Sequence, residues 1–479
     1  MRWSISHGAT VPSTDMVAKL SGLGSSGRHT QNCERDLHRV MAKTEQYFSA
    51  PISYVRARFY DFRTATEIWR PTPVIFPDDL ASAIWSRGPA AWEKIMLGND
   101  LSAPGQFWHH AATADWYATH PAAAVEDKSK LIPFSLYGDE VQAYKNTEAG
   151  AVNVLGWCSD LAFGNQAMER YCLCCVYAEQ IATRNTFTDI LAALAPRMRR
   201  MFERDDHPWS PSGWRFTYSS TQGDLKYVMD KFGFDTYRQN QFCLRCPCVK
   251  KCSDIGYTLG NFNESAAHMQ VRFSHQTFLD RTAPEDRARP ASCKRGFYGA
   301  WPDHGEYQHQ LAPLLRAAYA HFAAASKMLS FWLAHCAKQL ASQATATELD
   351  RQVHVCLFSY ARALQLMDSA GLIMPRDTAV EFHRMVLLHL RAYADMHRQS
   401  RLVAGTAVNR CLWLLIPKHH HFIHCAEDAL VCQLNPRATN LLCAESFVGM
   451  VGRISRGCHR SSVGTRTLER YFAIMQFKV

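Results

Sequence analysis

Three acidic residues in the sequence stand in local settings that suit metal-dependent chemistry. Asp139 ends the apolar run in LIPFSLYGDE, Asp224 follows the apolar run in WRFTYSSTQGDLKY, and Glu445 opens a helix-like stretch in LLCAESFVGMVGRIS. Three carboxylates brought together by folding are the minimum set that holds two divalent metals, Mg²⁺ or Mn²⁺, for phosphoryl transfer on nucleic acid. The sequence therefore predicts a catalytic trio of Asp139, Asp224 and Glu445.

Each acid also has a purely structural interpretation. Gly-Asp pairs are common in turns, an aspartate after a strand often caps a helix, and a glutamate in the first helical turn interacts favourably with the helix dipole. Gly138 is expected to let the backbone turn sharply before Asp139. Asp160, in the loop-like sequence GWCSDLAFG, competes with Asp224 for the second position of the trio.

The cysteine patch CLRCPCVKKC gives the sharpest local signal for metal binding. Cys243 and Cys246 form a CxxC pair, whose spacing tetrahedral Zn²⁺ accepts. Four thiols within ten residues do not fit one ion without strain, so the other ligands are expected from Cys252, His268, His275 or Cys293, with Cys252 and His268 preferred. Reduced thiols packed beside a turn are the alternative, and a thioredoxin-like role is disfavoured because no βαβ pattern surrounds the pair.

The run KHHHFIHC offers a second group of polar side chains. His420 and His424 are four residues apart and would share a helix face. No general base of the HExxH type lies between them, which favours hydrogen-bonded or phosphate-facing histidines over metal ligands.

Basic residues near the C-terminal end suit a nucleic-acid path. Lys418, Arg437, Arg453 and Arg456 are predicted to contact DNA, because phosphate contacts need only charge and reach. A solvated helix face is the alternative explanation.

The elements that would position these residues follow from the hydrophobic patterns. Four apolar runs are predicted strands (131–137, 151–158, 171–180 and 214–220), with a helix over TFTDILAALAPRMRRMFERD between the third and fourth. A second helix is expected over DLKYVMDKFGF. The order β-β-β-α-β-α is that of the beginning of an RNase H-like core.

Four regions are expected along the chain. Residues 1–125 form an N-terminal region, loosely ordered over 1–60 and with short helices over 80–125. Residues 126–238 begin a mixed α/β core, 239–405 form an insertion, and 406–479 complete the core with the Glu445 helix. The insertion comprises a Cys-rich patch (239–300) and a bundle of at least three helices (306–400), with breaks near ASQATATE and GLIMPRD.

Bulk composition fits a globular protein of two or three units. The chain has 479 residues, of which 47% are hydrophobic and 20% charged, and its formal net charge is +10. A moderately basic chain suits a DNA partner without requiring one. The sequence lacks an evident signal peptide or membrane-spanning run, so a nuclear or cytosolic location without a membrane partner is expected; a homo-oligomer is left open.

The order of several motifs resembles that of DDE-type, cut-and-paste transposases, most closely the Plavaka-type cysteine-rich elements. The motifs are IPFSLYGDE, GDLKYVMDKFGF, CLRC, PKHHHFIH, NPR and CAESFVGMVGRISR, within 131–262 and 409–475. The resemblance implies an RNase H-like fold, an insertion between the second and third acids, and Asp139, Asp224 and Glu445 as catalytic metal ligands. It also implies metal-dependent cleavage and transfer of DNA strands.

The chain departs from the pattern of that family at two points. Ala444 stands where the family often has the first acid of an Asp-Glu pair, and no DNA-binding finger is evident before the core. The alternative expectation is therefore a catalytically inactive, zinc-stabilised module that binds DNA or protein. A redox or metal-sensing protein is a third interpretation, which rests on the cysteines alone.

Overall fold

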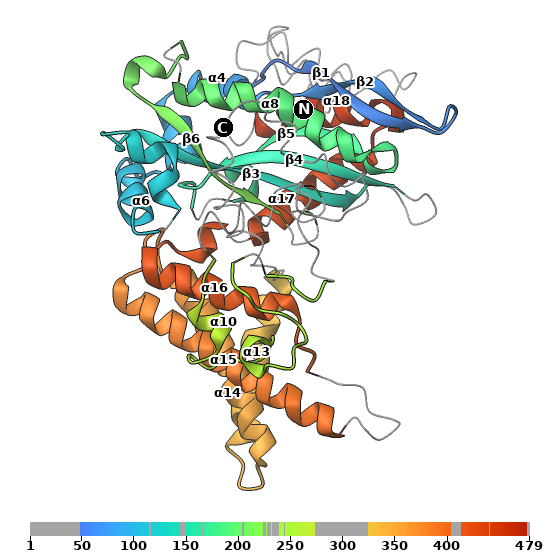
Figure 1. The fold of residues 1–479 in the computed structure, drawn as a ribbon. Coiled ribbons are helices and arrows are strands. Elements are labelled where there is room, and N and C mark those ends of the chain that lie inside the picture. The colour runs from blue at the N-terminus through green and yellow to red at the C-terminus, as the bar shows by residue number, and fades with distance from the viewer. Residues whose placement is uncertain are drawn as a thin grey trace, which may run out of the picture.

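The computed structural model consists of a sheet body and a helical body (Figure 1). It describes residues 48–114, 116–143, 150–163, 166–203, 206–223, 227, 231, 239–243, 245–273, 324–403, 413–439 and 441–476. The chain builds most of the sheet body first, continues through the helical body, and returns to the sheet with its last two helices. The sheet and its helices share one hydrophobic core, and the helical body has a core of its own.

The sheet body is built on one six-stranded sheet with the order β1-β2-β5-β4-β3-β6. The strands are β1 (Ser53–Asp61), β2 (Thr66–Val74), β3 (Leu131–Gln142), β4 (Ala151–Ser159), β5 (Tyr171–Ala178) and β6 (Arg215–Gln222). β3 pairs with β6 in parallel, and all other neighbours are antiparallel. The parallel partner needs a crossover connection, which includes α8 (Arg184–Glu203). Helices cover both sheet faces, which explains why β3 to β5 read as continuous apolar runs.

The four strands and the intervening helix predicted from residue 131 onward are confirmed as β3, β4, β5, α8 and β6. The predicted helix over DLKYVMDKFGF lies mostly outside the described residues. The expectation of loose order over residues 1–60 is wrong from residue 53 onward, because β1 pairs there with β2 in a regular antiparallel hairpin. Its apolar residues do not form a long run. In β1, however, Val55, Ala57 and Phe59 alternate with arginines, which is the pattern of a half-buried strand. The short helices expected over 80–125 are confirmed.

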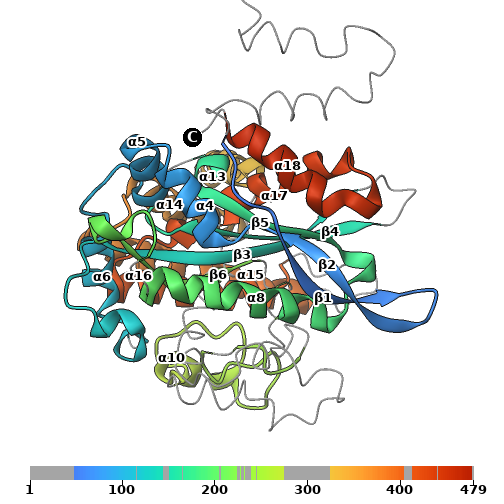
Figure 2. The same cartoon turned by 90° about the horizontal axis from the view of Figure 1, so that it is seen from above.

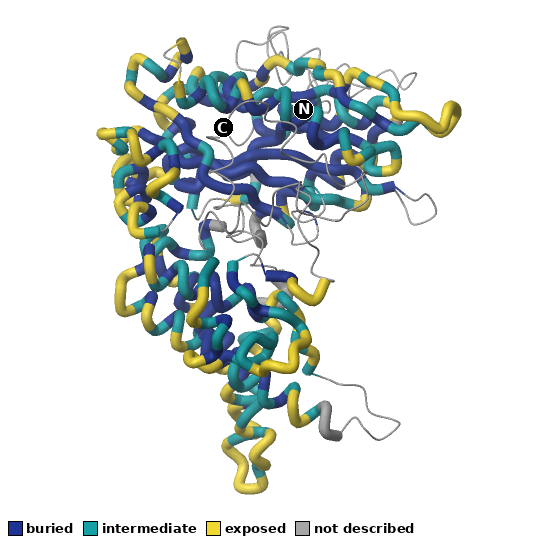
Figure 3. The backbone as a smooth tube through the Cα atoms, in the orientation of Figure 1, coloured by how far each residue is buried: buried dark blue, intermediate teal, exposed yellow. Residues whose placement is uncertain are grey.

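Helices pack on the two faces of the sheet. α17 (Leu441–Arg456) and α18 (Val463–Met475) lie on one face, and α8 lies on the other (Figure 2). α4 (Pro77–Trp85), α5 (Pro89–Trp92), α6 (Ala103–Ala111) and α7 (Ala167–Arg170) surround the sheet. Buried residues accordingly run along the central strands (Figure 3). Short helical turns occupy Glu93–Leu97, Tyr117–Thr119, Pro121–Ala124, Glu179–Ile181, Ser210–Ser212, Ile255–Tyr257, Pro436–Thr439 and Arg460–Ser462.

The helical body contains α13 (Ala324–Ala341), α14 (Glu348–Ser369), α15 (Arg376–Val403) and α16 (Pro417–Cys432), with the short α10 (Ala267–Gln270) beside them. The predicted breaks are confirmed, since α14 begins at the last residue of ASQATATE and ends just before GLIMPRD, in which α15 begins. Thr347 and Asp350 form a reciprocal capping box at the start of α14. Packing of α14, α15 and α16 around Phe382, Val386 and Leu390 forms the second core.

Asn435, in the Asn-Pro-Arg sequence, fastens the end of α14 to the segment that leads back to the sheet. Its buried side chain donates hydrogen bonds to the carbonyls of Met367, Ala370 and Gly371, at 2.9, 3.2 and 3.0 Å. These carbonyls lie at the end of α14, where helical partners are missing. The Asn-Pro-Arg sequence therefore has a structural role at the joint between the two bodies.

Candidate metal centre and the predicted acidic residues

Four potential metal ligands meet between a loop and a helix of the helical body. Cys243 and Cys246 come from the loop of residues 239–273, and His420 and His424 come from successive turns of α16. All four are fully buried. The loop brings its CxxC pair across 174 residues of sequence to the histidine pair.

The distances among the ligand atoms approach those of a tetrahedral zinc site. Cys246 Sγ lies 3.6 Å from Cys243 Sγ and 3.1 Å from His420 Nε2, and Cys243 Sγ lies 3.4 Å from His424 Nε2. The two Nε2 atoms are 3.0 Å apart. Zinc bonds of about 2.3 Å to sulfur and 2.0–2.1 Å to nitrogen give tetrahedron edges of about 3.8 Å (S–S), 3.6 Å (S–N) and 3.3 Å (N–N). Shifts of about half an ångström or less would complete the site, so the cluster can hold a zinc ion.

Charged residues around the cluster orient its ligands. His424 Nδ1 lies 2.9 Å from a carboxylate oxygen of Glu427, an arrangement that leaves Nε2 facing the cysteines. Arg272 pairs with Glu427, and Arg245 forms a two-pronged ion pair with Asp428 at 2.7 and 2.5 Å. Both arginines belong to the loop and both acids to α16, so these pairs hold the two walls of the cluster together.

The protonation states of two of the four ligands, Cys243 and His420, suit metal binding. Burial would raise the pKa of Cys243, but the hydrogen bond from Cys246 and the charges of His420 and His424 outweigh it, and hold that pKa well below its ordinary value. Burial lowers the pKa of His420. A thiolate and a neutral imidazole are the ligand forms of these side chains. Burial raises the pKa of Cys246, and the neighbouring Cys243 and Glu427 raise that of His424 against the effect of burial, so these two ligands would release protons to an incoming metal ion.

A second group of potential ligands adjoins the first and shares His420 with it. It consists of Cys248, His268 and His420, all buried. Burial lowers the pKa of His268 to about 4 and raises that of the Cys248 thiol. A neutral imidazole offers one nitrogen lone pair, so His420 can serve only one of the two groups at a time, and the group with four ligands is the more complete site.

The predicted zinc ligands are only partly brought together. Cys243 and Cys246 lie in the tetrahedral group, whereas His268 belongs to the adjoining group. Cys252 is exposed and belongs to neither group. His275 and Cys293 lie outside the described residues.

His420 and His424 form hydrogen bonds with Cys246 and Cys243, and the same four side chains form a group that could hold a metal ion. The sequence does contain a signal for this site, which is a pair of histidines on one helix face together with a CxxC pair elsewhere in the chain. Two half-sites of this kind complete a Cys₂His₂ set.

Asp139 lies within β3 rather than at its end. Tyr137 Oη donates a hydrogen bond to Asp139 Oδ2 at 3.1 Å, and the Tyr137 ring lies edge-on to Phe447 of α17. Side chains alternate along a strand, so Tyr137 and Asp139 share the face that α17 covers.

Gly138 is extended and paired with Leu155, so the expected sharp turn is absent. A Cβ at this position would lie 2.1 Å from Tyr227 Oη, and therefore a glycine is needed for the close approach of that ring.

Glu445 lies near the start of α17 and is half-buried. It precedes Gly452 by seven residues, nearly two helical turns, and both therefore lie on one side of the helix. A Cβ on Gly452 would come within 2.8 Å of Val141, so this side of the helix faces β3. Asp139 and Glu445 thus belong to the same helix–sheet contact. Ala444 is fully buried, and an acid at that position would point into the core.

Asp224 and Asp160 are the two acids considered for the second position of the trio. Asp224 lies outside the described residues. Asp160 is buried in the sheet body, where it accepts hydrogen bonds from Ser135 at 2.6 Å, from Gln222 at 3.4 Å and from Ser219. Its carboxylate is thus held by neighbouring strands, which is a structural role and does not favour it as the second acid.

Of the basic residues predicted to contact DNA, Lys418, Arg453 and Arg456 are exposed. Arg437 is half-buried, donates to the carbonyl of Asp368 at 3.1 Å and lies over the Phe163 ring. The Arg437 guanidinium is therefore engaged in contacts within the protein, and these contacts do not indicate that it binds a phosphate.

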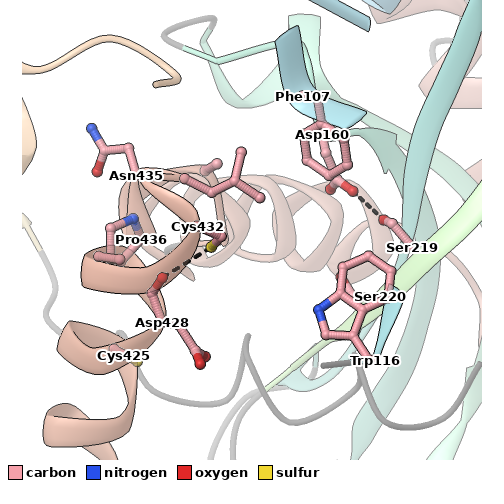
Figure 4. A pocket seen from close by; sticks show the side chains of 13 residues that line it. Phe107, Trp116, Asp160, Ser219, Ser220, Cys425, Asp428, Cys432, Asn435 and Pro436 are labelled. Atoms are coloured by element: carbon pink, nitrogen blue, oxygen red, sulfur yellow. Dashed lines mark hydrogen bonds between the residues drawn. The ribbon is translucent and has the colours of Figure 1, made fainter. Parts of the chain in front are cut away.

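A pocket lies where α16 meets the sheet body (Figure 4). Phe107, Trp116 and Asp160 line one side, and Asp428 and Asn435 line the other. The Asp160 carboxylate points toward Ser219 (Figure 4). The volume of about 60 Å³ is far below the 300–1,000 Å³ of ordinary ligand pockets, so we treat this space as a packing gap between the bodies.

Comparison with known proteins adds no family assignment. The chain matches no protein-family model, and no curated protein matches it in sequence. Among the helices of the described residues, none is long and apolar enough to cross a membrane.

Proposed function

We propose that this chain is a DDE-type, RNase H-like protein of a DNA mobile element, which cleaves and transfers DNA strands with two divalent metals in the nucleus. The observation that carries the proposal is the parallel pairing of β3 with β6 beside antiparallel β4 and β5. The order β5-β4-β3-β6, with α8 between β5 and β6, is the arrangement expected of an RNase H-like core. A strand order supports a fold but not a function, so the functional proposal rests on the positions of the acidic residues.

The strand register supports the pairing of the first two acids. Tyr137 of β3 pairs with Gln222 of β6. Asp139 follows Tyr137 by two residues, and Asp224 follows Gln222 by two residues. The proposal requires the carboxylate of Asp224 to stand beside that of Asp139.

The helix–sheet contact supports the third acid. Glu445 lies on the side of α17 that faces β3, and Asp139 lies on the face of β3 that α17 covers. Carboxylate oxygens are the ligands that Mg²⁺ and Mn²⁺ prefer. Asp139 and Glu445 therefore fit as ligands from two rigid elements.

The protein side of the mechanism follows from these positions. Bound Mg²⁺ or Mn²⁺ would supply Lewis-acid activation of a water or 3′-hydroxyl and stabilisation of the leaving oxygen. Asp139 and Glu445 would hold the metal ions between α17 and β3, and the positive charge of those ions would fix the position of the reacting phosphodiester. Tyr137, buried beneath them, orients the Asp139 carboxylate through its hydroxyl. Exposed Arg453 and Arg456 extend along the same helix and would contact the DNA backbone.

The proposal is tested by measuring how much supercoiled plasmid the purified protein and two variants nick in the presence of Mg²⁺. Asp139→Asn is expected to abolish nicking and to leave DNA affinity nearly unchanged. Glu140→Gln is the matched control, because Glu140 is the next residue, lies on the opposite sheet face and pairs with Lys231. Retained nicking in Asp139→Asn would refute the proposal.

A second candidate function is a zinc-stabilised module that binds DNA or protein without catalysis. The Cys/His cluster favours it, because that cluster can hold zinc independently of the acids. DNA binding by the zinc-loaded, unaltered protein without Mg²⁺, and no nicking when Mg²⁺ is added, would select this function.

A further inference from the structure

A groove on the helical body carries four basic side chains among the sixteen residues that line it. Its walls are the loop of residues 250–263 and the C-terminal half of α15. Its volume is about 590 Å³, which is ample for a bound chemical group. It is distinct from the acids of β3 and α17, which belong to the sheet body.

The charges in the groove favour an anionic ligand. Lys250, Lys251, Arg391 and Arg398 line it, against one lining carboxylate, Asp395. Arg391 also pairs with Glu264 beside the groove, at 3.3 Å, and the two lysines therefore supply most of the excess positive charge. Arg398 pairs with Asp395 but is 75% exposed, so its guanidinium also faces solvent. Lys251 is exposed, and the structure gives it no ion-pair partner among the described residues. Amide side chains of Asn261 and Asn263 add uncharged hydrogen-bonding groups.

One wall of the groove depends on the metal cluster. Lys250 and Lys251 lie four and five residues after Cys246, on the loop that the cluster fastens to α16. The other wall is part of α15, a continuous helix within the second core. Arg391 joins the two, because its Nε donates to the carbonyl of Phe262 at 2.9 Å. The groove is therefore a built surface between two fixed elements, with Cys252 exposed within it.

We propose that this groove binds the phosphate backbone of duplex DNA, as a second contact away from the strand-cleaving acids. This inference rests on the proposed function for the choice of DNA as the polyanion. A positively charged groove attracts a backbone irrespective of sequence, and each phosphate contact releases condensed counterions. Zinc in the Cys/His cluster would then set the position of Lys250 and Lys251 relative to α15.

The native Cys252 thiol reports directly on occupancy of the groove. Of the thirteen cysteines whose burial the structure describes, Cys252 alone is exposed. Zinc-loaded Asp139→Asn protein is alkylated with N-ethylmaleimide, with and without a 30-base-pair duplex and without Mg²⁺, and each peptide is followed by mass spectrometry. We expect the duplex to slow alkylation of Cys252 at least fivefold and to leave half-exposed Cys336, on α13, unchanged.

Salt titration of DNA affinity provides the second measurement. Lys251→Ala is compared with Lys338→Ala, which removes an exposed lysine from α13. One lost phosphate contact reduces the slope of log K against log salt by about 0.9, so the affinity ratio between 50 and 200 mM salt falls about 3.5-fold. This change is expected for Lys251→Ala only.

Three outcomes would overturn the proposal. The first is equal protection of Cys252 and Cys336 by the duplex, and the second is an unchanged salt slope in Lys251→Ala. The third is equal protection of Cys252 by inorganic phosphate at the same phosphate concentration, which would identify a small anion as the ligand. Neither measurement requires cleavage, so absence of plasmid nicking would refute the proposed chemistry and leave the groove standing.

Discussion

The Cys/His cluster makes a quantitative prediction about zinc. We expect about one zinc ion per purified chain, bound by Cys243, Cys246, His420 and His424. Structural zinc sites with four ligands contribute about 10–16 kcal/mol of apparent binding free energy. Divided evenly, one ligand is worth about 2.5–4 kcal/mol, or about two to three orders of magnitude in affinity. Removal of one ligand should therefore be readily measurable.

The same magnitudes predict what the loop does without its metal. The hydrophobic cluster that holds the loop near the site comprises Phe242, Cys243, Cys246 and Cys248. Full burial of a phenylalanine contributes about 1.5–3 kcal/mol, which is much less than the zinc contribution. Metal loss should therefore loosen the cysteine-bearing part of the loop, residues 242–252, whereas Phe262 keeps the later part of the loop in the second core.

The assay compares His424→Ala with two matched controls. His419→Ala removes a neighbouring histidine on α16 that belongs to neither ligand group, and Cys252→Ser removes the exposed thiol of the same loop. After dialysis against a weak chelator, zinc is counted by elemental mass spectrometry, and trypsin cleavage at Lys250 and Lys251 is timed. We expect His424→Ala to lose zinc and to be cleaved faster, and both controls to behave as the unaltered protein.

Two results would refute this reasoning. One is a His424→Ala variant that keeps its zinc, and the other is a Cys252→Ser variant that loses it. X-ray absorption on the unaltered protein adds an independent check. Two sulfur neighbours at about 2.3 Å and two nitrogen neighbours at 2.0–2.1 Å are expected, and a purely sulfur shell would contradict the assignment.

Two further predictions concern stability. Gly138→Ala places a Cβ about 2.1 Å from Tyr227 Oη, and overpacking of this kind costs about 1–3 kcal/mol of stability. Thermal unfolding should therefore show a lowered Tm for this variant. The control Gly371→Ala has open space around its Cβ and should show little change. Asn435→Ala leaves three carbonyls at the end of α14 without their donor, at a cost of about 1–3 kcal/mol. Denaturant titration against the exposed-residue control Gln339→Ala measures this cost, and equal midpoints would contradict the role assigned to Asn435.

Local pattern was sufficient for much of the sheet and the helical bundle. Apolar runs and helical periodicity identified β3 to β6, α8 and the breaks between α13, α14 and α15, because burial and capping of a segment depend on residues two to four positions apart. The CxxC pair likewise identified half of the metal cluster. The β1–β2 hairpin was not predicted, because a criterion based on apolar runs passes over the alternation of Val55, Ala57 and Phe59 with arginines in β1.

What the sequence by itself determined is therefore the set of elements and the residue types that can bind metal. Only the tertiary structure decided which of these residues meet. It joined Cys246 to His420 across 174 residues, and assigned Asp160 to a buried hydrogen-bonded network. It also brought the Tyr227 ring into close contact with Gly138. These outcomes depend on long-range packing, because a side chain's partners are set by the paths of distant segments, and local spacing carries no information about them.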